Sequence, residues 1–232
     1  MCGRYSIILT AAEIAEVFGL PRPGFATSPR YNVAPTQDAP VVVLDGGAPQ
    51  LTTARFGLIP FWTKGDAPPS VGLINARAET VSEKPAFRRA FSRSRCLVPA
   101  DGFYEWQGDK RGRNPYRIAM ADKRLVAFAG LCETFSAQNG QITRSFAIIT
   151  TAASEFVLPL HDRMPAILAT ADERTAWLQS PDTAVLHQLL RPFPGQLSAF
   201  AVSRLVNSVA NDGPECIVPV DEAAKADSPR IF

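Results

Sequence analysis

The sequence is poor in the residues that build metal centres and disulfide frameworks. It has 232 residues, with four cysteines and two histidines, and no two cysteines form a CxxC pair. Zinc-finger and thiol-redox spacings are therefore absent. Cys96 and Cys132 have apolar flanks, which predicts buried thiols in a protein of a reducing compartment.

The sequence also lacks long apolar runs. None approaches the roughly 18 residues that a membrane span needs, and no charged segment followed by an apolar stretch opens the chain. We therefore expect a cytoplasmic protein that makes no membrane contact. The formal net charge is only +2, and lysine is scarce beside arginine. Arginine binds phosphates and flat bases well, although a GC-rich genome gives the same bias.

Short apolar stretches separated by turn residues predict a fold rich in strands. Gly46-Gly47 and Asn139-Gly140 are typical of hairpin turns. The strands that we expect lie at 4–9, 41–44, 51–56, 96–99, 103–106, 116–119, 125–132, 143–151 and 197–202. A further turn is expected at 109–114.

Helices are predicted to be few and short. Thr10 precedes Glu13 by three residues, which is a capping-box pattern and predicts a helix at 11–18 ended by Gly19. Other helices are expected near 84–91, 172–178 and 182–190. The sequence thus predicts an α+β fold: a single domain at 1–221, built on a mainly antiparallel, barrel-like sheet with a few short peripheral helices. We expect the tail at 222–232 to fray.

Cys2 is the residue with the most distinctive chemistry. Methionine is normally removed before a small second residue, and its removal would leave Cys2 with a free α-amine beside its thiol. Such an aminothiol condenses with an aldehyde to an imine, which the thiol then closes to a thiazolidine ring. The amine titrates at about 7.7–8.0, so a useful fraction is nucleophilic at neutral pH. A cysteine at this position also occurs by chance, so the assignment depends on the rest of the chain.

Five further stretches accompany this N-terminus in a fixed order. Together they resemble the SRAP (SOS-response-associated peptidase) family, and the resemblance covers roughly residues 1–210. The matching stretches are Met1-Cys2-Gly3-Arg4, Tyr31-Asn32-Val33-Ala34-Pro35, Gly57-Leu58-Ile59-Pro60-Phe61-Trp62, Asn75-Ala76-Arg77-Ala78-Glu79-Thr80, Ala100-Asp101-Gly102-Phe103-Tyr104-Glu105-Trp106 and His161-Asp162-Arg163-Met164-Pro165.

The resemblance implies a function in DNA repair. Members of the family bind single-stranded DNA and capture abasic sites, whose ring-opened sugar is an aldehyde, as a stable thiazolidine on the N-terminal cysteine. The crosslink shields the lesion from strand cleavage. The family's catalytic residues fall on Cys2, Asn75, Glu105 and His161. The resemblance implies no metal and no cofactor, and the chain is expected to act as a monomer, bound to the nucleoid when it is on DNA.

Each of these assignments has a plainer alternative in the sequence alone. Glu105, set between aromatic residues, fits a proton shuttle with a raised pKa or a strand carboxylate that faces water. His161 fits either a catalytic or a structural histidine, and Asn75 either a positioning amide or a turn residue. His187 lies in a helical run and is interpreted as structural.

The DNA contacts are expected from cations and exposed aromatics near these positions. Arg4, Arg77 and Arg163 each lie within two residues of a proposed catalytic residue and are predicted to bind phosphates. Lys84 follows from the family pattern, and Arg88 and Arg89 are further candidates. Trp62 and Trp106 are predicted to stack on bases, with core packing as the alternative.

Three other functions remain open from the sequence. An N-terminal-nucleophile amidotransferase also begins Met-Cys-Gly, and glutamine hydrolysis would reveal it. A cysteine peptidase would use Cys2 with His161, and removal of Met1 by the chain itself is compatible with DNA capture. A non-catalytic single-strand binder would bind intact and abasic DNA equally.

Overall fold

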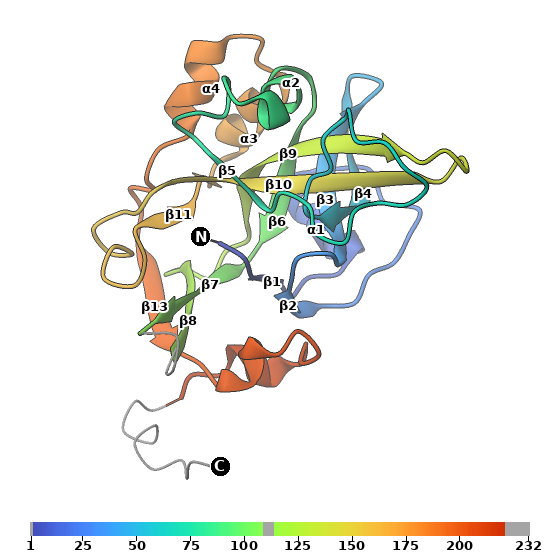
Figure 1. Ribbon diagram of the computed structural model, residues 1–232. Helices are drawn as coiled ribbons and strands as arrows, with labels where there is room; N and C mark the ends of the chain where they lie inside the picture. The colour runs from blue at the N-terminus through green and yellow to red at the C-terminus, as the bar shows by residue number, and fades with distance from the viewer. Residues whose placement is uncertain (1, 109–113, 221–232) are drawn as a thin grey trace.

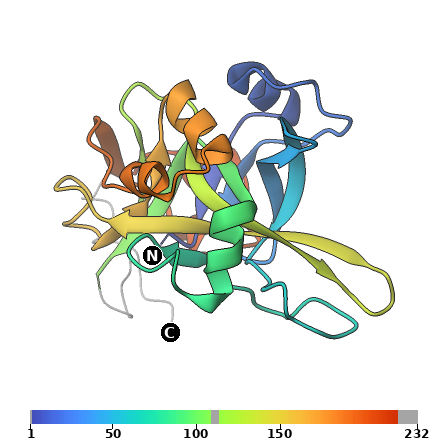
Figure 2. The ribbon, with the colours of Figure 1, turned by 90° about the horizontal axis from the view of Figure 1, so that it is seen from above.

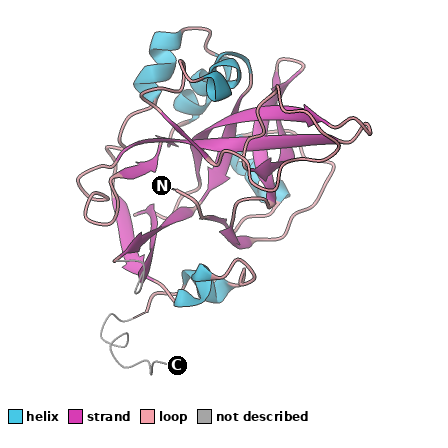
Figure 3. Ribbon diagram, in the orientation of Figure 1, coloured by secondary structure: helices cyan, strands magenta, loops and turns pink. Residues whose placement is uncertain are grey.

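The computed structural model describes residues 2–108 and 114–220. The expected fraying of 222–232 and most of the turn expected at 109–114 lie outside the described residues. The described part forms an α+β fold of mainly antiparallel strands with short helices at its margins (Figures 1 and 3). The predicted fold class is thereby confirmed.

A closed barrel of five strands is the centre of the fold. Each strand is hydrogen-bonded to the next, and the last pairs with the first, so these strands form a continuous ring. Four of the contacts are antiparallel, while β10 and β4 run parallel. Around the barrel the strands are β10 (Ile142–Ala152), β4 (Ala48–Phe56), β3 (Asp38–Asp45), β6 (Arg95–Ala100) and β9 (Val126–Ser136).

A second sheet carries the N-terminal segment. Its strands pair antiparallel, and β1 lies between β2 and β7. The order across this sheet is β13 (Leu197–Ala201), β8 (Asn114–Met120), β7 (Gly102–Gln107), β1 (Tyr5–Ile7) and β2 (Arg30–Val33). Strand β1 has a neighbour on each side. The strand that follows Cys2 in the chain is therefore held in place.

Three very short strands complete the sheets. β5 (Asn75–Arg77) and β11 (Arg163–Pro165) both pair with β10, and β12 (Ile167–Leu168) pairs with β9. The sequence predicted neither these strands nor β2, because two to four residues contain too little alternation to reveal a strand. Their conformation is set by the long strands beside them.

The helices follow the predicted positions. In α1 (Ala11–Phe18) the Thr10 side chain accepts from the Glu13 backbone, the Glu13 carboxylate accepts from the Thr10 backbone, and Gly19 ends the helix with φ at 65°. The other α-helices lie together at one end of the barrel (Figures 1 and 2), and the Arg174 guanidinium of one of them lies 4.7 Å from the ring centroid of Phe18 at the end of α1. They are α2 (Pro85–Arg93), α3 (Ala171–Gln179) and α4 (Thr183–Leu189), and two 3-10 turns, η1 (Arg204–Asn207) and η2 (Pro214–Ile217), follow β13. Within the described ranges, no helix is both long enough and apolar enough to cross a membrane.

A chain of buried aromatic rings joins the two sheets. Tyr5 on β1 makes edge-to-face contacts with Phe56 and Phe128, with ring centroids 5.9 Å and 6.2 Å apart. Phe56 stacks on Phe146 at 5.1 Å, and Phe103 on β7 meets Phe128 at 6.0 Å. Pairs of this kind contribute about 0.5–1.5 kcal/mol each beyond their buried area. The first strand is thus packed directly against the barrel, only three residues after Cys2.

Candidate active site

A buried polar cluster fixes the start of the chain. The Asp101 carboxylate accepts hydrogen bonds from the Ser6 hydroxyl and the Ile8 backbone N–H, both at 2.5 Å. It also accepts one from Arg117 Nη2 at 2.5 Å. Asp101 and Arg117 are 7% and 8% exposed, so the pair is almost fully withdrawn from water. This cluster locks β1 to β7 and β8 and sets the position of the residues before β1.

Cys2 lies just before β1 and is fully buried. Its thiol donates a weak hydrogen bond to the Arg4 carbonyl oxygen at 3.8 Å. Burial raises the pKa of this thiol far above its usual range, and the negative charge of Glu105 raises it further. The thiol is therefore protonated at neutral pH and needs a base before it can act as a nucleophile.

Glu105 is a buried carboxylate beside this thiol. It lies on β7 two residues after Phe103, which pairs with Tyr5, so its side chain leaves the same face of the sheet as Phe103. Its exposed fraction is 2%. The alternative of a strand carboxylate facing water is therefore wrong. Its influence on the pKa of Cys2 places it within electrostatic reach of the sulfur.

Asn75 joins the barrel to the N-terminal segment. Its side-chain amide donates to the Cys2 carbonyl oxygen at 3.1 Å and to the Ile148 carbonyl oxygen at 3.4 Å. Its Oδ1 atom is buried and accepts no hydrogen bond from the part of the chain that the structure describes. Asn75 belongs to β5 rather than to a turn, and it offers an unused acceptor next to Cys2.

His161 lies where the chain returns to β10. Its Nδ1 atom is 2.9 Å from the Arg163 backbone N–H and 2.9 Å from a carboxylate oxygen of Asp162. The first contact needs an unprotonated Nδ1 and the second a protonated one. Burial lowers the pKa of His161, although Asp162 opposes this shift. We therefore assign a neutral ring with its proton on Nε2.

Strand β10 brings the remaining site segments together. Thr150 pairs with Arg77 of β5 on one side and with Pro165 of β11 on the other. Arg163 donates to the Thr150 carbonyl oxygen at 2.6 Å and forms a bidentate ion pair with Glu79 at 2.6 Å and 2.9 Å. Arg163 is thus close to the site but already neutralised by a carboxylate.

The predicted DNA-contacting residues fall into two groups. Arg77, Lys84 and Trp62 are exposed, Trp62 at 47%, and no hydrogen bond within the described residues engages their side chains. Trp106, by contrast, is half-buried and donates through its indole N–H to Asn207 at 2.7 Å. The first group is available to a ligand without rearrangement.

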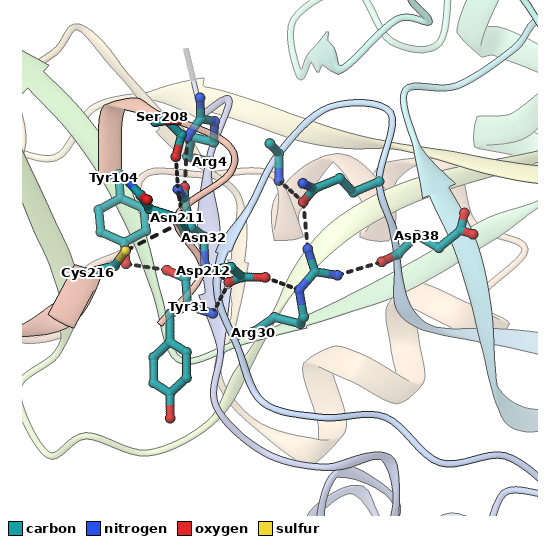
Figure 4. Close-up of polar contacts among 12 residues, drawn as sticks. Arg4, Arg30, Tyr31, Asn32, Asp38, Tyr104, Ser208, Asn211, Asp212 and Cys216 are labelled. Carbon is teal, nitrogen blue, oxygen red and sulfur yellow. Dashed lines mark hydrogen bonds and ion pairs between the residues drawn. The ribbon is translucent and has the colours of Figure 1, made fainter. Parts of the chain in front are cut away.

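Arg4 belongs to a network that holds the end of the described chain against β2 (Figure 4). Its guanidinium donates to Asn32 Oδ1 and to the Val206 carbonyl oxygen, both at 2.8 Å. The buried Asn32 amide donates in turn to the carbonyl oxygens of Val206, Ser208 and Asn211. Most of the Arg4 donor capacity is therefore used inside the protein.

Asp212 anchors the same network from the other side. Its carboxylate accepts from the backbone N–H groups of Tyr31 and Asn32, at 2.6 Å and 2.7 Å, and pairs with Arg30. The Tyr104 hydroxyl donates to the Tyr31 carbonyl oxygen at 2.5 Å. Figure 4 shows how these side chains converge on β2. The sequence motifs include Asn32, Glu79 and Asp101, but the sequence assigned none of them a role in the site, and no sequence signal marked Asp212.

Comparison with known proteins decides the family. The family model for SOS response associated peptidase (SRAP) matches residues 1–209 of this chain. The chain belongs to the SRAP family. This SRAP chain is 41% identical over 223 residues to the abasic site processing protein YoaM of Bacillus subtilis, across 94% of this chain and 97% of YoaM. It is 31% identical over 263 residues to the abasic site processing protein HMCES of Gallus gallus, across 95% of this chain and 78% of HMCES.

Solved structures share the fold of this SRAP chain. A protein from Bacteroides thetaiotaomicron superposes with a TM-score of 0.81 at 25% identity, covering 94% of this chain and all of that chain. A protein from Bordetella bronchiseptica superposes with a TM-score of 0.75 at 24% identity, covering 87% of this chain. The barrel and its N-terminal sheet are therefore a shared architecture.

Proposed function

We propose that this protein captures abasic sites in single-stranded DNA as a thiazolidine crosslink on Cys2 and thereby shields the lesion from strand cleavage. The observation that carries the proposal is the environment of Cys2: a protonated thiol lies beside the buried Glu105 carboxylate, and Asn75 holds the Cys2 carbonyl. Family membership supports it, because the relatives YoaM and HMCES are abasic site processing proteins.

The reaction begins once Met1 has been removed, by the chain itself or by an aminopeptidase. The free Cys2 amine attacks the aldehyde carbon of the ring-opened sugar, and the carbonyl oxygen leaves as water to give an imine. The Cys2 sulfur then adds to the imine carbon, its proton is transferred, and the ring nitrogen ends as N–H. One water is lost overall, and the crosslink is the product.

Glu105 is the base that this chemistry requires. The thiol has a raised pKa, so its proton must move as the carbon–sulfur bond forms. A buried carboxylate within electrostatic reach of the sulfur accepts that proton and can return one to the departing oxygen. The Asn75 amide fixes the Cys2 backbone, and its unused Oδ1 accepts from the amine or from a sugar hydroxyl.

His161 supplies a neutral hydrogen-bond donor. With Nδ1 occupied by the Arg163 N–H, its Nε2–H is the group that can assist opening of the sugar ring. Exposed Arg77 and Lys84 bind backbone phosphates, and Trp62 stacks on a base beside the lesion. Arg4, Trp106 and Arg163 have internal partners and would contact DNA only with their remaining donors and surfaces.

The deciding experiment uses a single-stranded oligonucleotide with one abasic site. The expected result is a heat-stable band on a denaturing gel, with an intact mass equal to the chain without Met1 plus the oligonucleotide less one water. Cys2→Ala should abolish the band while leaving non-covalent binding, and Cys2→Ser should give an imine but no stable ring. Cys216→Ala is the matched control and should crosslink normally. An undiminished band in Cys2→Ala, or none from the trimmed protein, would overturn the proposal.

A further inference from the structure

A second cleft, away from Cys2, lies between α2, α3 and the ends of β3, β9 and β10. Its volume is about 270 Å³, just below the roughly 300–1,000 Å³ of pockets that hold drug-sized ligands. A cleft of this size suits a single nucleobase rather than a folded partner. Figure 2 shows α2 lying across the two long strands that form its floor.

The cleft contains a buried carboxylate without a partner. Glu133 on β9 is 6% exposed and lines the cleft. In residues 2–108 and 114–220 no group forms a hydrogen bond or ion pair with its carboxylate oxygens. Burial raises the pKa of this carboxyl, and the charge of Arg89 opposes the rise. The side chain is largely buried while its carboxylate oxygens remain accessible in the cleft, so they are available to accept hydrogen bonds from a ligand there.

The rim of the cleft is cationic. Arg89, Arg93 and Arg144 line it, and Arg93 has no hydrogen-bond partner in the described ranges. Arg95 also lines it, but its five hydrogen bonds to backbone carbonyls at the ends of α2 and α3 make it a structural residue. Asp45 is the other acidic lining residue. A cationic ligand would be repelled by the arginines, and a simple anion would be repelled by Glu133.

The ligand must therefore combine neutral N–H donors with a phosphate. A nucleotide in a DNA strand meets both needs, because its base supplies donors and its backbone supplies the anion. Among the bases, guanine offers two adjacent donors, N1–H and the N2 amino group, which match the two oxygens of one carboxylate. Adenine, cytosine and thymine each offer a single donor position beside an acceptor.

The cleft is also within reach of a strand bound at Cys2. Arg77 pairs with Thr150 and Glu133 with Ser145, five residues apart on β10, which corresponds to about 17 Å. At the stacked spacing of roughly 3.4 Å per nucleotide, this distance is no more than about five nucleotides. Exposed Lys84, Arg88, Arg89 and Arg93 lie along α2 between the two places.

An exposed aromatic pair lies at the entrance to this route. Phe61 and Trp62 are each 47% exposed, and the Arg89 guanidinium lies over the Phe61 ring at 4.3 Å. The loop that carries them is tied to the cleft wall, because Ile59 N–H donates to the Ser145 hydroxyl and that hydroxyl donates to the Glu133 carbonyl oxygen. The strand thus has cations and a stacking surface on its way to Glu133.

We propose that this cleft reads a guanine within about five nucleotides of the abasic site, with Glu133 accepting from its Watson–Crick edge and Arg93 and Arg144 binding its phosphates. The inference rests on the proposed function, since it takes the bound strand to be single-stranded DNA. It adds a preference for one base on one side of the lesion. Without it, the choice of DNA substrate would depend only on the aldehyde of the abasic site.

The test measures binding without chemistry. Thymine-only oligonucleotides carry a tetrahydrofuran abasic analogue, which has no aldehyde, and a single guanine at each of five positions on either side. Fluorescence anisotropy of the protein lacking Met1 should show binding at least about fivefold tighter at one or two adjacent positions on one side. Inosine, which lacks the N2 amino group, should give a smaller gain, and adenine none.

Variants locate the preference in the cleft. Glu133→Gln should abolish the guanine gain, measured as the ratio of the affinities for the guanine-containing and all-thymine strands. Asp45→Asn, which removes the same charge from the cleft lining, is the matched control that keeps this ratio. Equal affinity at every guanine position, or a gain that survives Glu133→Gln, would overturn this inference. Neither result would touch the proposed function, which fails separately if the trimmed protein forms no crosslink with a true abasic site.

Discussion

The Asp101 cluster allows the stability of the site to be tested directly. Replacing Asp101 with alanine removes the acceptor of three hydrogen bonds, each at 2.5 Å, and leaves Arg117 charged and 8% exposed without its partner. Breaking a buried pair in this way costs about 3–5 kcal/mol, against a total stability of roughly 5–15 kcal/mol. We expect Asp101→Ala to lower the free energy of unfolding by that amount.

Urea denaturation of four variants measures the effect. Asp101→Ala is compared with Arg117→Met, with the double variant, and with Asp122→Ala. Asp122 forms an ion pair with Arg124 at 3.4 Å that is largely exposed, so its loss should cost less than about 1 kcal/mol. The double variant removes both charges and should be more stable than the sum of the single effects implies, by about 0.5–3 kcal/mol.

Two results would refute this reasoning. One is a loss below about 1 kcal/mol in Asp101→Ala, and the other is strict additivity in the double variant. A functional effect should accompany the loss of stability. Since the cluster sets the register of β1 against β7, Asp101→Ala should form the crosslink more slowly at a temperature where it is still folded.

Four further predictions concern the DNA surface and the site. Trp62→Ala should weaken single-strand binding by about 1–3 kcal/mol in anisotropy titrations, without changing the unfolding midpoint, because the ring is half exposed. Arg77→Ala should reduce the slope of log affinity against log salt by about 0.7, and an unchanged slope would remove it from the phosphate contacts. Glu79→Gln should tighten DNA binding by releasing Arg163, whereas equal affinity would show that the pair is only structural. Because burial lowers the pKa of His161, the ring stays neutral as the pH falls through 6.5. The contribution of His161, measured as the ratio of the crosslinking rates of the parent protein and His161→Ala, should therefore decline only below that pH, and a half-maximal ratio at 6.5 would contradict the assignment.

Local signals in the sequence predicted most of the regular structure. The capping box at Thr10 and Glu13 gave α1 its bounds, because the signal and the structure involve the same few residues. The Gly46-Gly47 turn likewise predicted the β3–β4 hairpin, and both glycines adopt positive φ. Closure of the barrel was harder to predict from local signals. It depends on the parallel contact between β10 and β4, which joins segments about ninety residues apart, for instance Phe56 with Phe146.

The roles of the cations could not be predicted in the same way. Arg77 and Arg163 look alike in the sequence, each two residues after a proposed catalytic residue. In the fold one is exposed, while the other is neutralised by Glu79, which lies 84 residues earlier in the chain. The burial of Glu105 could not be predicted from the sequence either, because an acidic residue in an alternating strand can lie on either face of the sheet.

The burial of Cys2 has a consequence for how the protein is made. Cys2 is fully buried in the folded chain, where β1 pairs with β7 and Arg4 donates to the carbonyl oxygen of Val206. On a ribosome adding roughly 5–20 residues per second, about 10–40 seconds separate synthesis of the first residues from that contact. A separate aminopeptidase would have free access to Met1 during this interval, before the last segment closes. The yield of protein with a free Cys2 amine would then depend on whether Met1 is removed before folding is complete.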